Sequence, residues 1–270
     1  MREKKHLGGE EGMQAVVGRN PVLEALRGER ALNALYLEQG NASTAAAQAV
    51  QLAKKRGIPV KNVSKEKLAQ LSGGAAHQGM AATLASHSYA DLEDIYERAG
   101  EDPLFVILLD ELEDPHNLGA IVRTAEAAGA HGVVIPRRRS ALLTPAAAKA
   151  AAGALEHLPV ARVNNLSATI EELKARGVWV YAADMDGESY CATHFDGPVA
   201  LVIGSEGRGV GRLVKENCDA VVSLPMYGQL GSLNASVAAG ILMYEIARQR
   251  NGVTAVPPMT AAVGRKGIDG

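Results

Sequence analysis

Short apolar runs alternate with helical segments along this chain, and the runs change in character near residue 103. Before that point four strands are predicted, at residues 14–18, 32–37, 58–63 and 80–85. The Asn20–Pro21 pair is expected to begin the first helix, with the asparagine as its cap. Residues 13–85 are therefore predicted to form a small α/β domain of about 75 residues.

From Pro103 onward the apolar runs are more continuous. Leu104–Leu109 has no polar interruption, which is typical of a strand buried on both faces of a parallel sheet. Helices are expected over Leu118–Ala128 and from Ser232 to about Arg250. Further strands are predicted at 132–136, 160–163, 178–183, 198–203 and 220–224. Strands alternating with helices predict an α/β fold with a parallel sheet in three layers over residues 103–250.

The stretches outside these two units are more polar. Residues 86–102 are expected to form a linker that carries a short helix, and residues 1–12 and 251–270 are expected to be tails. The first residues are charged and have no apolar segment behind them, so no secretory signal is predicted. No apolar run reaches the roughly 18 residues that a membrane helix needs.

Composition narrows the function further. Cys191 and Cys218 form no CxxC pair and have no histidine at metal-ligand spacing, so we expect buried or half-buried thiols in a cytoplasmic protein without a metal. The net charge of −2 and a pI near 6.4 are not those of a typical nucleic-acid-binding domain. Any contact with RNA would have to come from a local basic patch.

Two predicted strands end in loops where polar residues lie among glycines. One strand ends at Ile203 and is followed by the turn 204–209, which contains Glu206; the other ends at Leu224 and is followed by the loop 225–234. Ligands bind at the carboxyl ends of strands in open α/β sheets, so these loops are expected to form the floor of one site. Known phosphate loops do not fit, because GxxxxGK[ST] is absent and Gly204–Gly209 does not match GxGxxG. The GxSxG nucleophile motif is also missing.

A third cluster, residues 114–123, contains Asn117 and Arg123. Taken singly, each residue has an ordinary explanation as a helix cap, a solvated arginine or a turn glycine. In order and spacing, the three clusters resemble the motifs of the SpoU/TrmH family, which are RNA ribose 2′-O-methyltransferases of the SPOUT superfamily. The resemblance covers Leu104 to Arg250, and Gly231 stands where many members have serine or threonine.

Residues 17–26 and 77–79 resemble the L30e-like substrate-binding domain of the RlmB-type subfamily, which methylates a guanosine in large-subunit ribosomal RNA. The family resemblance implies a C-terminal trefoil knot, S-adenosyl-L-methionine held by the knotted loops, and an obligate homodimer with the site at the subunit interface. We expect the cofactor to press on the backbone of Gly204. The resemblance implies cofactor contacts at Gly204, Gly209, Leu224 and Leu233, and catalytic roles for Asn117, Arg123, Glu206, Ser232 and Asn234.

The residue chemistry restricts these roles. An arginine keeps its proton in proteins, so Arg123 is expected to grip an RNA phosphate rather than act as a base. Glu206 is the better titratable candidate, or it tethers Asn117 or Arg123, while Ser232 and Asn234 position substrate or cofactor. RNA contacts are expected from Arg19, Arg137, Arg138 and Arg139, with further candidates at Arg27, Arg30 and 54–56.

The sequence therefore predicts a cytoplasmic, homodimeric, S-adenosylmethionine-dependent enzyme that methylates a guanosine ribose of 23S rRNA. One alternative keeps the reaction and changes the substrate to tRNA. Another is a non-catalytic RNA-binding factor in ribosome assembly, which the presence of Asn117, Arg123, Glu206, Ser232 and Asn234 disfavours.

Overall fold

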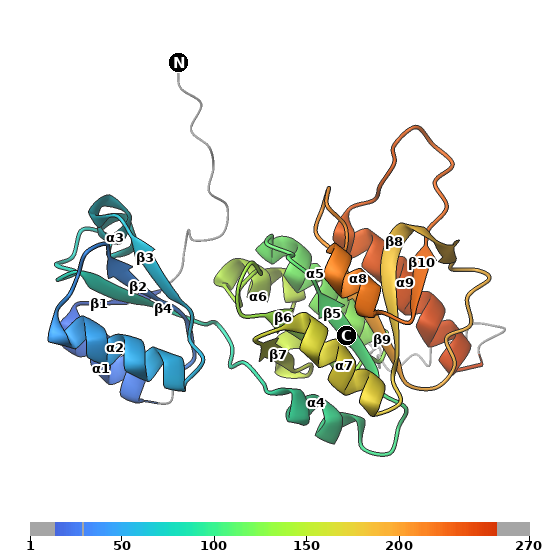
Figure 1. The fold of residues 1–270 in the computed structure, drawn as a ribbon, viewed down its shortest axis with the longest axis horizontal. Helices are drawn as coiled ribbons and strands as arrows, with labels where there is room; N and C mark the ends of the chain where they lie inside the picture. The colour runs from blue at the N-terminus through green and yellow to red at the C-terminus, as the bar shows by residue number, and fades with distance from the viewer. Residues whose placement is uncertain (1–13, 29, 253–270) are drawn as a thin grey trace, which may run out of the picture.

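A computed structural model describes residues 14–28 and 30–252. The expected N-terminal tail lies outside the described residues, as does the expected C-terminal tail except for Asn251 and Gly252. The described chain forms two α/β units, each with its own sheet (Figure 1). No group of acidic residues, histidines and cysteines in these ranges is arranged to hold a metal ion, and no helix in them is long and apolar enough to cross a membrane.

The N-terminal unit is a four-stranded mixed sheet in the order β1-β4-β2-β3. Strand β4 is antiparallel to β1 and β2, whereas β2 and β3 are parallel. Buried side chains of α1 and α2 pack with one face of the sheet, and Leu68 of α3 packs with Tyr36 on the other. The elements are β1 (Ala15–Val17), α1 (Arg19–Arg27), β2 (Leu32–Glu38), α2 (Thr44–Lys55), β3 (Val60–Val63), α3 (Lys65–Leu71) and β4 (Met80–Leu84).

The C-terminal unit confirms the predicted parallel sheet. Its six strands lie in the order β10-β8-β9-β5-β6-β7, and every neighbouring pair is parallel. The strands are β5 (Phe105–Leu109), β6 (Gly132–Pro136), β7 (Val160–Val163), β8 (Trp179–Ser189), β9 (Val199–Ile203) and β10 (Ala220–Ser223). The helices are α4 (Leu92–Ala99), α5 (Pro115–Ala127), α6 (Pro145–Ala151), α7 (Leu166–Ala175), α8 (Arg212–Asn217) and α9 (Ala235–Arg250), with a 3-10 turn at Ala154–Glu156.

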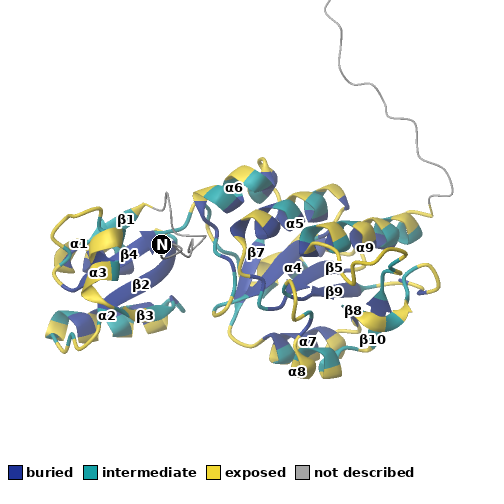
Figure 2. Cartoon of the chain, turned by 90° about the horizontal axis from the view of Figure 1, so that it is seen from above, coloured by how far each residue is buried: buried dark blue, intermediate teal, exposed yellow. Residues whose placement is uncertain are grey.

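Helices cover both faces of this sheet. One apolar core joins the sheet to α5, α6 and α9, and a second joins the opposite face to α4 and α7. The central strands β5 and β9 are buried along their whole length, as Figure 2 shows in dark blue. The chain runs outward from β5 through β6 to β7, and then returns so that β9 pairs with the other side of β5. The strand order therefore reverses beside β5, where the loops at the carboxyl ends leave room for a ligand.

Five local expectations were wrong. Helix α9 begins at Ala235 with Asn234 as its cap, not at Ser232. Helix α1 begins at Arg19 after Gly18, whose φ of 95° suits glycine, so Asn20 lies inside the helix and caps nothing. Helix α5 begins at Pro115, because the Asp114 side chain accepts a hydrogen bond from the backbone N–H of His116. Strand β8 continues past 183 to Ser189, with a shift of register against β10. Cys191 is exposed, whereas Cys218 is half-buried and burial raises its thiol pKa to about 12.

Candidate active site

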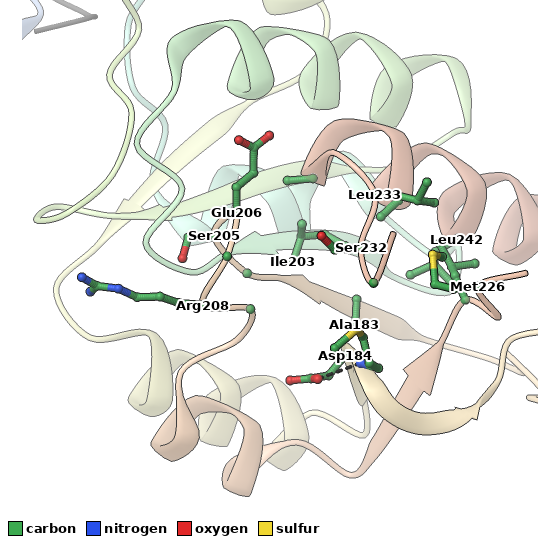
Figure 3. A pocket seen from close by; sticks show the side chains of 18 of the residues that line it. Ala183, Asp184, Ile203, Ser205, Glu206, Arg208, Met226, Ser232, Leu233 and Leu242 are labelled. Atoms are coloured by element: carbon green, nitrogen blue, oxygen red, sulfur yellow. Dashed lines mark hydrogen bonds between the residues drawn. The ribbon is translucent and has the colours of Figure 1, made fainter. Parts of the chain in front are cut away.

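The loops that follow β9 and β10 line one cavity of about 420 Å³ at the carboxyl edge of the sheet. The predicted residues Gly204, Gly209, Leu224, Ser232 and Leu233 all line it, together with Glu206. Figure 3 shows Glu206 and Arg208 on one side of the cavity, and Met226, Leu233 and Leu242 on the other. The two loops therefore line one cavity, where the strand-end argument predicts a site.

Gly204 is required by its own loop. A Cβ on Gly204 would lie 2.0 Å from the backbone carbon of Gly209 and 2.2 Å from the nitrogen of Val210. Backbone hydrogen bonds in both directions between Ser205 and Gly209, at 3.1 and 2.9 Å, hold this return of the chain. The expected reason for glycine here is that a cofactor would approach its backbone closely. The structure shows a more immediate reason, because any side chain on Gly204 would collide with the loop itself.

Asp110 fastens the same loop to the central strand. It follows β5, is 7% exposed, and accepts a hydrogen bond from the backbone N–H of Gly211 at 2.7 Å. Burial raises the pKa of this carboxyl group, the hydrogen bond from Gly211 opposes that shift, and the neighbouring Glu111 adds to it. Asp110 thus holds the far end of the glycine-rich turn against the sheet.

Three polar side chains from separate elements meet beside the cavity. The Glu206 carboxylate oxygen Oε1 accepts hydrogen bonds from Asn117 Nδ2 at 2.9 Å and from Asn234 Nδ2 at 2.6 Å. Asn234 Nδ2 also donates to Asn117 Oδ1 at 3.0 Å. Its own Oδ1 accepts from the backbone N–H groups of Ser236 and Val237, which begins α9. The carboxylate therefore orients both amides, and it contacts Asn117 rather than Arg123.

A second cavity of about 310 Å³ adjoins the first and shares Ser205, Glu206 and Arg208 with it. Asn117, which is 5% exposed, lines this second cavity. Glu111 lies at its edge between two cations: Arg139 Nη1 is 2.8 Å from one carboxylate oxygen and Arg208 Nη1 is 3.8 Å from the other. Two connected spaces, one mostly apolar and one polar, thus meet at Glu206.

The remaining predicted arginines line neither of the two cavities. Arg123 is exposed on α5 and lines neither of them. Arg19 lines a hollow of about 680 Å³ in the N-terminal unit, together with His77 and Lys65. Arg138 and Arg139 are exposed at the carboxyl end of β6, whereas Arg137 is half-buried.

Sequence reasoning missed Asp184 and Met226, which also line the first cavity. Asp184 follows the apolar part of β8, and its carboxylate lies 2.9 Å from Lys215 Nζ of α8. In the structure Asp184 lies inside β8, which continues to Ser189, and its partner Lys215 lies on α8. Neither the second half of β8 nor α8 was predicted, so no local pattern pointed to Asp184.

Comparison with known proteins identifies the two units separately. Residues 104–244 match the model of the SpoU rRNA methylase family, and residues 15–90 match the model described as RNA 2′-O ribose methyltransferase substrate binding. A Bacillus subtilis protein named as a TrmH family tRNA/rRNA methyltransferase, YacO, is 52% identical over 242 residues, which cover 88% of this chain and 96% of YacO. This chain belongs to the SpoU/TrmH family of RNA 2′-O-methyltransferases.

Solved structures of SpoU methyltransferases share the fold. AviRb from Streptomyces viridochromogenes, in complex with AdoMet, has a TM-score of 0.57 and 27% identity, with 89% of this chain and 91% of AviRb covered. A structure described by 2-OH methylation of C/U34 on tRNA has a TM-score of 0.51 and 30% identity, and it covers 56% of this chain. The family and the mixed α/β fold with a parallel sheet are thus confirmed.

Proposed function

We propose that this SpoU/TrmH family enzyme uses S-adenosyl-L-methionine to methylate the ribose 2′-hydroxyl of a guanosine in 23S rRNA. The observation that carries the proposal is the meeting of two cavities at Glu206, which orients Asn117 and Asn234. One cavity suits the cofactor and the other suits the target nucleotide. Membership of the family supplies the reaction, and the match of residues 15–90 to a substrate-binding model supports RNA as the partner.

The first cavity fits the cofactor in size and lining. Its volume of about 420 Å³ lies within the range of small-molecule sites, and leucine and isoleucine side chains beside exposed backbone suit an adenosine. We assign the cofactor contacts to Gly204, Gly209, Leu224 and Leu233. When bound, S-adenosylmethionine supplies the methyl group from its sulfonium centre, in a transfer that needs no metal.

The polar residues at the boundary position the acceptor. Because Glu206 Oε1 already accepts from two amides, we assign it to holding Asn117 and Asn234 in place. Asn117 lines the second cavity and orients the ribose. Ser232 lines the first cavity and orients the cofactor. Positioning of this kind contributes much of the rate in displacement reactions.

We propose a homodimer in which Arg123 serves the partner's site. Exposed Val237, Ile241 and Tyr244 give α9 an apolar outer face. Helix α5 packs beside α9, where Thr124 lies next to Gly240, so Arg123 borders this face. A second copy covering the face would bring Arg123 to another chain, where its fixed charge grips an RNA phosphate.

We assign a separate role to each of the two units. Residues 13–85 form the L30e-like RNA substrate-binding domain, in which Arg19 contacts RNA; residues 86–102 are the linker; and residues 103–250 form the SPOUT domain with its C-terminal knot. A tRNA substrate is the second candidate, because of the C/U34 structure, which covers 56% of this chain. AviRb covers 89%, which favours a substrate that needs both units.

The test is methyl transfer from labelled S-adenosylmethionine to 23S rRNA and to bulk tRNA, with ribose methylation mapped in cells that lack the protein. We expect one guanosine of 23S rRNA to lose its 2′-O-methyl group, and calorimetry to detect cofactor binding. Loss of a tRNA methyl group would instead support the second candidate. Absence of cofactor binding would leave a non-catalytic RNA-binding factor as the explanation.

A further inference from the structure

The contact between the two units brings together basic residues that are far apart in the sequence. Arg137 Nη1 donates a hydrogen bond to the carbonyl oxygen of Gly57, which follows the carboxyl end of α2. Gly57 is the residue after the basic run Lys54–Arg56, and Arg137 begins the run Arg137–Arg139. Figure 1 and Figure 2 show β7 and α6 on the side of the C-terminal unit that faces the N-terminal unit. The two basic runs therefore adjoin across the joint.

A second arginine strengthens the same joint. Arg162 of β7 is 6% exposed, stacks on the Tyr89 ring at 4.3 Å, and donates to the carbonyl oxygens of Leu32 and Asn33 at 3.5 and 3.4 Å. The Tyr89 hydroxyl donates to Asn33 Oδ1 at 2.6 Å. Burial lowers the pKa of Arg162, and repulsion by Arg137 contributes to that shift. The joint is thus built from cations and neutral acceptors, without a carboxylate on Arg137 or Arg162 in the part of the chain that the structure describes.

The residues of the two runs divide into structural and exposed cations. Arg56 is used structurally, because its guanidinium donates to the carbonyl oxygens of Ala25, Leu26 and Arg30. Lys54, Lys55 and Arg138 are exposed, and among the described residues none of them forms an ion pair. These three side chains are therefore available to a negatively charged partner.

The exposed cations lead to the candidate active site. Arg139, next to Arg138, pairs with Glu111 at the edge of the second cavity, and Glu111 also faces Arg208 of the glycine-rich loop. Basic residues thus continue from the end of α2, across the joint, to the mouth of the site. Within residues 14–28 and 30–252, Glu111 is the one carboxylate at ion-pair distance from these cations, and it lies at the end nearest the cavity.

We propose that Lys54, Lys55, Arg138, Arg139 and Arg208 form one continuous track for the phosphate backbone of the substrate RNA, with Arg137 and Arg162 aligning its two halves. The inference rests on the proposed function, and it adds which surface the RNA follows and that a single RNA contacts both units at once. An RNA backbone fits because its charges repeat at regular spacing, and because lysine and arginine contacts to phosphate need no base sequence. The joint then sets the distance between the captured RNA and the methylated nucleotide.

The test measures binding of a fluorescent fragment of 23S rRNA at several salt concentrations. Each lost phosphate contact lowers the slope of log affinity against log salt by about 0.7 to 0.9. The Lys54→Gln, Lys55→Gln, Arg138→Gln triple variant should therefore lose about 2 to 3 in slope, and roughly 10²-fold in affinity near ~0.15 M salt. Cofactor affinity by calorimetry should not change. The control for the single variant Arg138→Gln is Arg98→Gln. Arg98 is also an exposed arginine, but it lies on α4, which precedes the amino end of β5.

A variant that keeps every charge tests the alignment. Gly57 has a φ of +62°, and a Cβ there would lie 2.1 Å from Arg137 Nη1, so Gly57→Ala should displace the arginine. Affinity for an RNA long enough to reach both units should fall at least about tenfold, because the second contact is no longer held in register. Arg137→Gln breaks the same contact without changing Gly57, and should give the same loss.

The inference is wrong if the triple variant behaves like Arg98→Gln, or if both joint variants keep full affinity for long RNA. Equal competition by polyglutamate and by RNA would indicate a general polyanion surface, and would also overturn it. These outcomes leave the proposed function standing, provided that the wild type binds S-adenosylmethionine and methylates RNA. A wild type that binds neither cofactor nor RNA would overturn both.

Discussion

Glu206 accepts a hydrogen bond from the side chain of Asn234 at 2.6 Å, across the two loops that end β9 and β10. The same oxygen accepts from Asn117, so a single carboxylate joins all three motifs of the family. This arrangement distinguishes a positioning role from a proton-accepting role. A positioning carboxylate needs an oxygen at this point, whereas a base needs the negative charge.

We therefore expect different results from two substitutions of Glu206. Glu206→Gln can keep an acceptor oxygen for both amides and should retain methyl transfer within about tenfold, whereas Glu206→Ala releases both amides and should lose roughly 10²-fold or more. Single-turnover transfer from labelled S-adenosylmethionine measures both, with cofactor affinity by calorimetry as the control. A glutamine variant as inactive as the alanine variant would indicate that Glu206 takes the proton.

Much of the C-terminal sheet could be predicted because its strands are buried on both faces. Runs such as Leu104–Leu109 leave no polar position for a solvent-facing side, so their type and place follow from the sequence. The second half of β8 is polar and pairs with β10 after a register shift, and α8 has six residues, which is too short for a helical period to appear. These elements depend on tertiary pairing that no local pattern records.

The candidate active site also has a part that local sequence signals predicted and a part that they did not. Strand ends and glycines indicated the loops that form the cavity, since those signals are local. The convergence of Asn117, Glu206 and Asn234 depends on how three distant segments meet, and it was foreseen only as one option for Glu206. The exposed position of Arg123 agrees with its ordinary explanation as a solvated helix arginine, and Arg123 lines neither of the two cavities. The resemblance names the residue as catalytic, and the position of Arg123 in one chain does not follow from that.

Asp110 should make stability depend on pH in an unusual direction for an aspartate. Burial raises the pKa of Asp110 in the folded state, so ionising this carboxyl group destabilises the fold. The destabilisation is absent below the pKa of the unfolded chain, about 3.9, and is complete once the pH exceeds the pKa of the folded state. Asp110→Asn keeps an acceptor for the Gly211 N–H and removes the charge. Its melting temperature should exceed that of the wild type at pH 7, and the difference should shrink toward pH 4.

Asp110→Ala provides the matched comparison. It removes the acceptor of the Gly211 N–H, so it should be destabilised by about 0.5–1.5 kcal/mol at both pH values. An asparagine variant whose advantage grows on acidification would contradict the burial argument.

The outer face of α9 should hold the dimer together. Ile241→Lys places a charge in the centre of the exposed apolar face, next to Val237 and Tyr244, and should convert the protein from dimer to monomer in sedimentation analysis. Leu213→Lys is the control, because Leu213 is also exposed and apolar but lies on α8. If both variants sediment as the wild type does, the subunits associate through another surface.

Arg123 should act in the site of the partner subunit. The homodimers of Arg123→Ala and Glu206→Ala are each expected to lose roughly 10²-fold in rate, since every site lacks one residue. A dimer with one chain of each kind contains one site with both residues intact and one site with neither. If subunits mix at random, half of the dimers are of this kind, so activity should return to about a quarter of the wild-type value.

The rescue separates two arrangements that a single chain cannot distinguish. If Arg123 served its own chain's cavity, every site in the mixture would still lack one residue, and no activity would return. Arg123→Lys then tests what the side chain does there. Lysine keeps the positive charge but loses the fork that holds two phosphate oxygens, so its rate should fall roughly 10²-fold with unchanged cofactor affinity. A lysine variant whose rate recovered at higher pH would show that the side chain at this position takes the proton, and the assigned role of Arg123 would be wrong.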